Sequence, residues 1–230
     1  MPPYSHDAPD GVGPHVAVIF DLDGILTDTA DLHFQSWMDL SREMGIPFDR
    51  AANEALRGLS RPDSLRIFLG EHAARFTPAQ QADIMARKND RYIERLADMG
   101  PDDALPGALE LLESLRKRGV RTAVASSSRN AKLVLEKLEF GRLLDAVVDG
   151  NDVELSKPDP RVFLTAAERI GVPPARCVVI EDAESGVAGA LVASMKVIGV
   201  GPIERVGRAH RIVAALSELD AESVLALLDG

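Results

Sequence analysis

The chain has 230 residues, of which 46% are hydrophobic and 27% charged, and its formal net charge is -10. This composition is ordinary for a globular protein with one full core and a smaller attached domain, and the acidic balance argues against a nucleic-acid partner, because phosphate backbones are bound by basic surfaces. No apolar run is long enough for a membrane helix and no secretion signal is recognisable, so we expect a cytoplasmic protein without a membrane partner.

The first strand of the chain ends in a pair of carboxylates. Residues 1–14 contain four prolines and two glycines and are predicted to be a flexible tail. The apolar run 16–20 is rich in β-branched residues, which is typical of a strand buried on both faces. Asp21 and Asp23 follow at once, at the strand end where α/β sheets bind ligands, and Gly24 allows a tight turn. In isolation, Asp21 would be better explained as a helix N-cap and Asp23 as a turn residue, because aspartate is common in turns.

A helical insertion follows this acidic loop. No convincing strand pattern occurs before residue 104, and the sequence Gly100-Pro101-Asp102-Asp103 is typical of a return linker. We therefore predict an all-helical cap domain at residues 30–103. Its helices are predicted at residues 31–44, 51–58, 61–74 and 78–99.

From Leu105 the pattern changes to alternating helices and strands, which indicates βαβ units and a parallel sheet. We predict an α/β fold: a Rossmann-like core of residues 15–29 and 104–230, with helices on both faces of the sheet. Further strands are predicted at residues 120–125, 146–148, 177–180 and 197–200, the last being the final core strand, and helices at 107–119, 130–138, 160–170 and 221–228.

Polar residues occur in the loops after four of the predicted strands, in a pattern that suits phosphoryl transfer. Carboxylate oxygens without histidine or cysteine suit Mg²⁺, and a lysine and a hydroxyl beside them suit a phosphoryl group. Each signal is weak alone, since a single lysine is usually exposed and an acidic pair often caps a helix. The residues are Asp21 and Asp23, Ser126, Lys157, and Glu181 with Asp182.

These residues match the four motifs of the haloacid dehalogenase superfamily, and the chain resembles a phosphotransferase of that superfamily over nearly its whole length after the tail. The resemblance implies that Asp21 is the nucleophile that becomes an aspartyl-phosphate and that Asp23 is the general acid/base. It also implies roles for Ser126 and Lys157 at the phosphoryl group. Magnesium would be held by the Asp21 carboxylate, the Asp23 backbone carbonyl and Asp182, with Glu181 in support.

The predicted cap is similar to that of the β-phosphoglucomutase family in the stretches 28–37, 57–65 and 87–92, as is the core stretch 125–130. This resemblance implies that Arg61 binds the phosphate distal to the transfer site, beside Ser128, Arg129 and Asn130. It places Thr29 and His33 at the hinge that controls Asp23. The sugar would be lined by Trp37, Gly58, Ser64 and Lys88. Mild differences from the family pattern, such as Arg57 and Ala183, remove no catalytic group.

The implied activity is interconversion of β-D-glucose 1-phosphate and D-glucose 6-phosphate through β-glucose 1,6-bisphosphate, by a monomer. A sugar-phosphate phosphatase with the same nucleophile is the nearest alternative. A phosphoacceptor signalling domain is disfavoured by the helical insertion and the Asp-x-Asp pair. Without the resemblance, simpler explanations hold for four cap residues: packing for His33 and Trp37, and ordinary exposed cations for Arg61 and Lys88.

Overall fold

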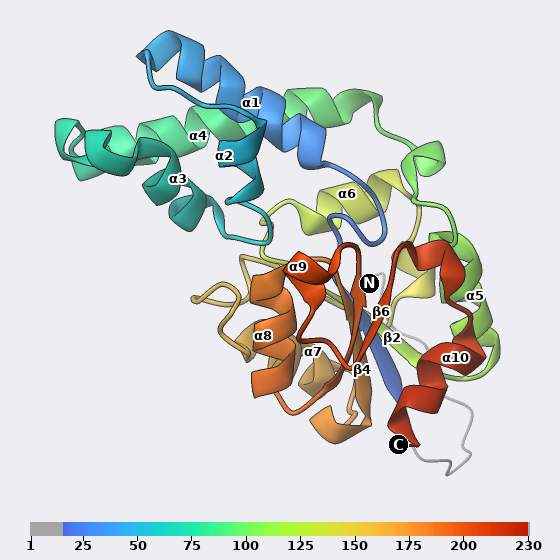
Figure 1. Ribbon diagram of the computed structural model, residues 1–230. Coiled ribbons are helices and arrows are strands. Elements are labelled where there is room, and N and C mark those ends of the chain that lie inside the picture. The colour runs from blue at the N-terminus through green and yellow to red at the C-terminus, as the bar shows by residue number, and fades with distance from the viewer. Residues whose placement is uncertain (1–15, 230) are drawn as a thin grey trace.

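The computed structural model describes residues 16–229, so the tail predicted at residues 1–14 lies outside the described residues. In these residues, six parallel strands form one sheet in the order β3-β2-β1-β4-β5-β6. Helices cover both faces of the sheet, and four more lie beyond one of its ends (Figure 1). The predicted α/β fold is confirmed. The strands are β1 (Ala17–Phe20), β2 (Arg121–Ala125), β3 (Ala146–Val148), β4 (Cys177–Glu181), β5 (Lys196–Val200) and β6 (Arg211–Val213).

Strand β1 lies in the middle of the sheet, between β2 and β4. Its last residue, Phe20, is paired with Val124 of β2 and Ile180 of β4, so the three strands end at one level. All four residues of β1 are fully buried, as the unbroken apolar run predicted. Because the carboxyl ends of parallel strands share one edge, residues directly after β1, β2 and β4 are brought together there.

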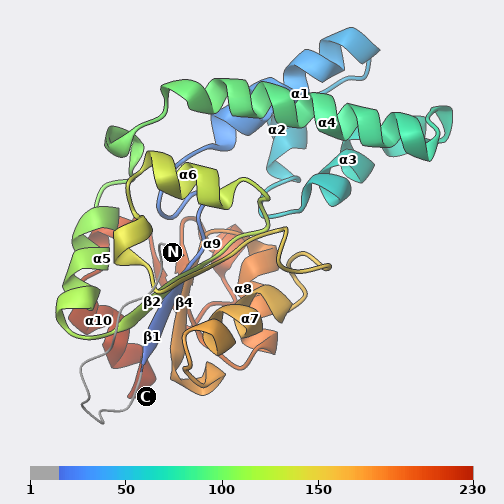
Figure 2. The ribbon, with the colours of Figure 1, turned by 180° about the vertical axis from the view of Figure 1, so that it is seen from behind.

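Two apolar cores form on opposite faces of the sheet because neighbouring residues of a strand point in opposite directions. On one face, Val18 and Phe20 pack against α5, α6 and α10, and on the other, Ala17 and Ile19 pack against α7 and α8 (Figures 1 and 2). The helices of this sheet core are α5 (Ala108–Lys117), α6 (Ala131–Lys137), α7 (Arg161–Arg169), α8 (Glu184–Val192), α9 (Ile203–Val206) and α10 (Ala221–Leu225).

The four helices beyond the sheet end, which we call the cap helices, have an apolar core of their own. In this cluster Trp37, 2% exposed, packs on Phe68 with ring centroids 4.8 Å apart. Local signals set the helix ends: Gly45 ends the first helix in the left-handed conformation, and Thr77 forms a capping box with Gln80. The cap helices are α1 (Ala30–Met44), α2 (Arg50–Glu54), α3 (Arg61–Leu69) and α4 (Pro78–Arg95).

Helix α4 also contributes to the sheet core. Ile84 belongs to the core of the cap helices, whereas Tyr92, near the other end of α4, belongs to the same apolar cluster as Leu22 and Leu26. The chain crosses between the two parts twice, and the crossings are joined by hydrogen bonds. The Thr27 hydroxyl donates to the Asp103 carbonyl at 2.7 Å, and the Leu105 amide donates to the Leu26 carbonyl at 2.9 Å.

Several predicted element ends were wrong. The helix expected at 61–74 ends at Leu69, where Gly70 has φ +47°, and a 3-10 helix continues over Gly70–Arg75. Strand β6 was missed because it is a three-residue edge strand in which Arg211 and Ile212 are not buried. Two further helices end early, since α2 closes at Glu54 and α10 at Leu225. None of the described helices combines the length and apolar character that crossing a membrane requires.

Candidate active site

Three buried carboxylates meet where β1 and β4 end. Asp21 directly follows β1, Glu181 is the last residue of β4, and Asp182 comes next. Since β1 and β4 are paired in register, these side chains converge, and one oxygen from each lies within 4.8 Å of the others. The cluster offers only oxygen donors, the type that hard divalent cations prefer.

Lys157 is the cation of this cluster. Its side chain is fully buried, with Nζ 2.5 Å from Asp21 Oδ1 and 2.6 Å from Glu181 Oε1. Burial alone would lower the pKa of Lys157, but the charges of Asp21 and Glu181 outweigh it and raise the pKa above its ordinary value. The ammonium group therefore stays charged and leaves Asp21 with one oxygen, Oδ2, that Lys157 does not bond.

The carboxylates remain in excess of the cations around them. Burial, with the charge of Asp21, raises the pKa of Asp182 to about 7, and burial raises that of Glu181 to about 8 against the opposing charge of Lys157. A further cation would relieve this excess, so the cluster is compatible with metal binding. Gly24, with φ +86°, leaves room for the Asp182 carboxylate, because a side chain there would overlap that group.

Asp23 lies beside the cluster with different surroundings. Its carboxylate accepts a hydrogen bond from the Thr29 hydroxyl, at the start of the first cap helix. Burial raises the pKa of Asp23 to about 6, and the negative charge of Asp21 contributes. Near neutral pH the group can therefore both give and take a proton, which is the property of a general acid/base.

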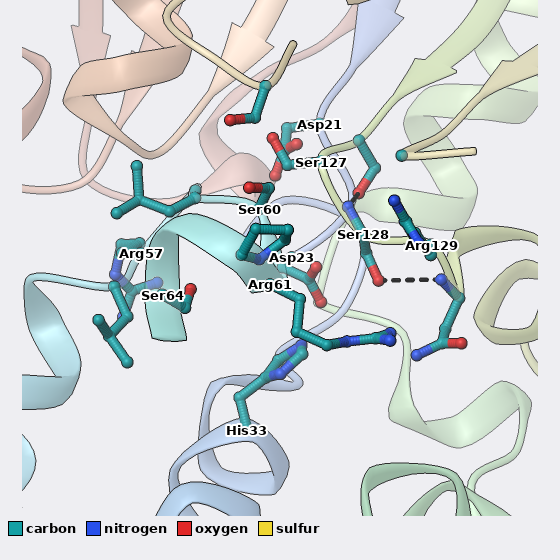
Figure 3. A pocket seen from close by; sticks show the side chains of 18 of the residues that line it. Asp21, Asp23, His33, Arg57, Ser60, Arg61, Ser64, Ser127, Ser128 and Arg129 are labelled. Carbon is teal, nitrogen blue, oxygen red and sulfur yellow. Dashed lines mark hydrogen bonds between the residues drawn. The ribbon is translucent and has the colours of Figure 1, made fainter. Parts of the chain in front are cut away.

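One cavity between the sheet core and the cap helices contains both sets of predicted residues. The carboxylates Asp21 and Asp23 line it together with Arg61 and Lys88, which come from the cap helices. Figure 3 shows Arg61 reaching from the cap side toward Ser128 and Arg129. The further predicted residues that line this cavity are His33, Trp37, Gly58, Ser64, Ser126 and Asn130.

Two guanidinium groups of the cavity, those of Arg61 and Arg129, lack an ion-pair partner among the described residues. The Arg61 NH2 group donates instead to Asn89 Oδ1 at 2.6 Å. Burial lowers the pKa of Arg61 and the nearby Arg129 lowers it further. Two guanidinium groups that face each other in this way suit an anion between them, such as a phosphate.

Lys88 is 3% exposed, and its Nζ lies 2.5 Å from His33 Nδ1. Burial, followed by the charge of Arg61, lowers the pKa of Lys88 to about 7. Burial and the neighbouring Lys88 hold the pKa of His33 well below 6.5, so the imidazole is neutral and can accept at Nδ1. Lys88 is therefore not part of a solvated charged face.

Some predicted residues lie outside the cavity wall. Lys157 and Glu181 are fully buried behind Asp21, and Thr29 acts on Asp23 from the hinge. Asp182 lines a second hollow, on the other side of the cluster. Trp37 fits both the packing role and the cavity-lining role considered for it, since it packs in the core of the cap helices and also reaches the cavity wall.

Several contacts between the cap helices and the sheet core were not predicted. Asn89 Oδ1 accepts from Asn130 Nδ2 at 2.9 Å as well as from Arg61. The Ser156 hydroxyl donates to Asp63 at 2.6 Å, and Arg57 NH1 lies 2.8 Å from Asp182 Oδ2. Each contact joins segments far apart in the chain, and nothing in the sequence pattern could have paired them.

The fold and the site together define an α/β phosphotransferase. The chain belongs to the haloacid dehalogenase-like hydrolase family, whose model matches residues 15–194, and the resemblance inferred from the four motifs is thereby confirmed. Over 208 residues it is 41% identical to a β-phosphoglucomutase of Bacillus subtilis (strain 168), covering 90% of this chain and 92% of that protein.

Two other relatives bear on the activity. A crystal structure of the β-phosphoglucomutase of Clostridium difficile superposes with a TM-score of 0.90 at 32% identity, covering 94% of this chain and 97% of that one. A phosphorylated carbohydrates phosphatase of Thermotoga maritima is 28% identical over 92% of this chain and 97% of its own length. The two enzyme activities considered in the sequence analysis, mutase and sugar-phosphate phosphatase, thus both occur among the relatives.

Proposed function

We propose that this protein is a β-phosphoglucomutase, which interconverts β-D-glucose 1-phosphate and D-glucose 6-phosphate. The observation that carries the proposal is the single cavity in which Asp21 and Asp23 face Arg61 and Lys88 of the cap helices. A reaction that passes through a bisphosphate needs cations at both of its phosphates. Lys157 lies beside Asp21, and Arg61 with Arg129 lies at the other end.

The metal we propose is Mg²⁺, because Asp21, Asp182 and the Asp23 backbone carbonyl offer hard oxygen donors, with Glu181 in support. When bound, the ion would offset the negative charge shared by the carboxylates and the phosphoryl group. Lys157 does the same from the other side of Asp21, through its 2.5 Å contact.

Asp21 would carry the phosphoryl group as an aspartyl-phosphate. A hydroxyl of β-glucose 1-phosphate attacks the phosphorus, the bond between phosphorus and the Asp21 oxygen breaks, and Asp23 takes the hydroxyl proton. After the bisphosphate reorients, Asp21 attacks its other phosphorus, and Asp23 returns the proton to the departing sugar oxygen. A pKa of about 6 for Asp23 suits both directions near neutral pH.

The remaining residues would bind and orient the sugar phosphate. Ser126 and Ser128 face the cavity from the end of β2, and the Ser126 hydroxyl already accepts from the Ser128 amide at 3.0 Å. Gly58, Ser64, Lys88 and Trp37 line the sugar side, while Arg61, Arg129 and Asn130 bind the distal phosphate. Thr29, which donates to Asp23, and His33, which contacts Lys88, would lie at the hinge through which the position of the cap controls Asp23.

We propose that the cap domain comprises residues 30–103 and the core domain 15–29 with 104–230. The hydrogen bonds of Thr27 to Asp103 and of Leu105 to Leu26 support boundaries at these crossings. A cap that closes over the sugar would exclude water and favour transfer to a hydroxyl over hydrolysis. We further propose that the protein acts as a cytoplasmic monomer on small sugar phosphates and has no nucleic-acid partner.

The test is an assay with β-glucose 1-phosphate, Mg²⁺ and a trace of the bisphosphate. Formation of glucose 6-phosphate at a rate far above phosphate release supports the mutase, with α-glucose 1-phosphate as the matched control substrate. Release of phosphate and glucose instead would identify a sugar-phosphate phosphatase, the activity named for the Thermotoga maritima relative. Phosphorylation of Asp21 without turnover of either substrate would contradict both and indicate a phosphoacceptor domain.

A further inference from the structure

Four charged side chains form a continuous chain of contacts across one side of the site. Arg57 NH1 lies 2.8 Å from Asp182 Oδ2, and Arg57 Nε lies 2.9 Å from Glu54 Oε1. The same Glu54 oxygen lies 2.7 Å from Arg205 NH1. Glu54 and Arg57 belong to the cap side, whereas Asp182 and Arg205 belong to the sheet core, so the chain of contacts joins the two parts twice.

Arg205 lies on α9, which follows the carboxyl end of β5. Strand β5 pairs with β4, and Gly199 is opposite Glu181, so the two strands end side by side. A fifth strand end thus contributes to the site, in addition to the four that the sequence motifs mark. Gly201, with φ +120°, precedes α9, and a Cβ there would lie 2.8 Å from Arg205 NH2, so a larger residue would displace the guanidinium from this position.

We propose that Arg205 is a positioning residue: through Glu54 it holds Arg57 on Asp182 and keeps the cap side closed over the metal side of the site. This inference rests on the proposed mutase function. The cap segment already lies against the sheet core here, since a Cβ on Gly58 would be 2.8 Å from both Ala183 Cβ and Ser185 Oγ.

The charge of Arg205 is essential to this role because it attracts the Glu54 carboxylate. Glu54 in turn holds the half-buried Arg57 side chain in place. The Arg57 side chain is 24% exposed and that of Arg205 is 29% exposed, whereas that of Glu54 is 48% exposed, so water weakens both contacts without abolishing them. Without Arg205, Glu54 keeps Arg57 as its partner and loses the ion pair that joins it to the sheet core. Of the two ion pairs that join the cap side to the sheet core here, only that of Arg57 with Asp182 would then remain.

The test compares Arg205→Gln, Arg205→Lys and the control Arg208→Gln by steady-state kinetics and by the ratio of phosphate released to glucose 6-phosphate formed. Arg208 is exposed on the same segment, so its replacement removes the same charge without the contact. We expect Arg205→Gln to raise KM for β-glucose 1-phosphate about threefold to tenfold and to raise the hydrolysis ratio, in line with a partly screened ion pair. Arg205→Lys keeps the charge and should keep KM and the hydrolysis ratio near those of the wild type. Arg208→Gln should leave both quantities unchanged.

Ionic strength and a double-mutant cycle separate positioning from a loss of folding. Added salt should raise KM of the wild type by a larger factor than KM of Arg205→Gln, because screening of the anionic substrate is common to both and screening of the Arg205 contact occurs only in the wild type. The effects of Glu54→Gln and Arg205→Gln on KM should be less than additive in the double variant, because both substitutions break the same contact. Equal kinetics of Arg205→Gln and Arg208→Gln, with an active wild type, would overturn the inference. Absence of mutase activity in the wild type would instead overturn the proposed function.

Discussion

Lys157 Nζ contacts Asp21 Oδ1 at 2.5 Å, although the two residues are 136 positions apart in the sequence. Both side chains lie in the protein interior and are almost fully shielded from solvent. The contact orients the carboxylate and compensates its charge. It also leaves Oδ2 as the oxygen that Lys157 does not bond, and hence as the nucleophile of the proposed reaction.

Asp21→Asn should abolish turnover and leave the fold intact. The amide keeps the shape of the carboxylate and can still accept a hydrogen bond from Lys157 at its oxygen, but it cannot form an acyl phosphate. We expect mutase activity to fall at least about a thousandfold, as for loss of a nucleophile. Circular dichroism and the thermal midpoint should stay close to wild type. Asp102→Asn, at an exposed position, is the matched control, and full activity of Asp21→Asn would contradict the assignment.

The pKa of Lys88, about 7, predicts a pH dependence of kcat/KM. The charged form binds an anionic sugar phosphate, so kcat/KM should fall as the pH rises above about 7 and the free protein loses this proton. Lys88→Arg keeps its charge to much higher pH and should remove the fall. An unchanged alkaline limb in that variant would contradict the prediction. The groups that face Lys88 are Asp23, His33, Arg61, Tyr92 and Arg95.

Gly186→Ala should damage the metal side of the site. A Cβ at Gly186 would overlap the Glu181 carboxylate, which is held by Lys157 and by the Ala183 amide at 2.8 Å. Displacing it leaves buried polar groups without partners, at about 1–3 kcal/mol of unfolding free energy. Chemical denaturation should show this loss, and Mg²⁺ titration should show weaker binding. Gly100→Ala, where the added Cβ meets open space, should show neither.

Asn89→Ala should weaken substrate binding more than turnover. Asn89 Oδ1 accepts hydrogen bonds from Arg61 and Asn130, so it positions two proposed ligands of the distal phosphate that come from different parts of the molecule. We expect KM to rise about fivefold to fiftyfold for a lost charge-assisted hydrogen bond, with kcat changed less. Gln81→Ala, on the same helix but bonded to the Phe76 carbonyl, is the control. An equal effect of both variants would mean that helix α4 was merely perturbed.

The central site could be predicted because it depends on topology. Parallel strands end at one edge, so residues directly after β1, β2 and β4 had to come near one another once the strands were recognised. Asp21 accordingly clusters with Asp182 and lines the cavity with Ser126. The charge chain through Arg205 could not be predicted in this way. Glu54 and Arg205 are 151 residues apart, and their contact depends on how the cap helices lie on the sheet core, which no local pattern encodes. Strand β6 escaped notice for another reason, since Arg211 and Ile212 of its three residues are not buried and the strand therefore lacks the apolar run that marks β3.

Near its C-terminal end, helix α4 is anchored through Tyr92 in the apolar cluster of the sheet core. Its first residue, Pro78, lies at the opposite end of the helix. Its 18 residues span about 27 Å, so a tilt of roughly 10° about the anchored end would carry the distant end through about 5 Å. Lys88, one turn from the anchor, would move far less. If the cap helices turn about this anchor, the residues near Pro78 move most and the ammonium group of Lys88 moves least.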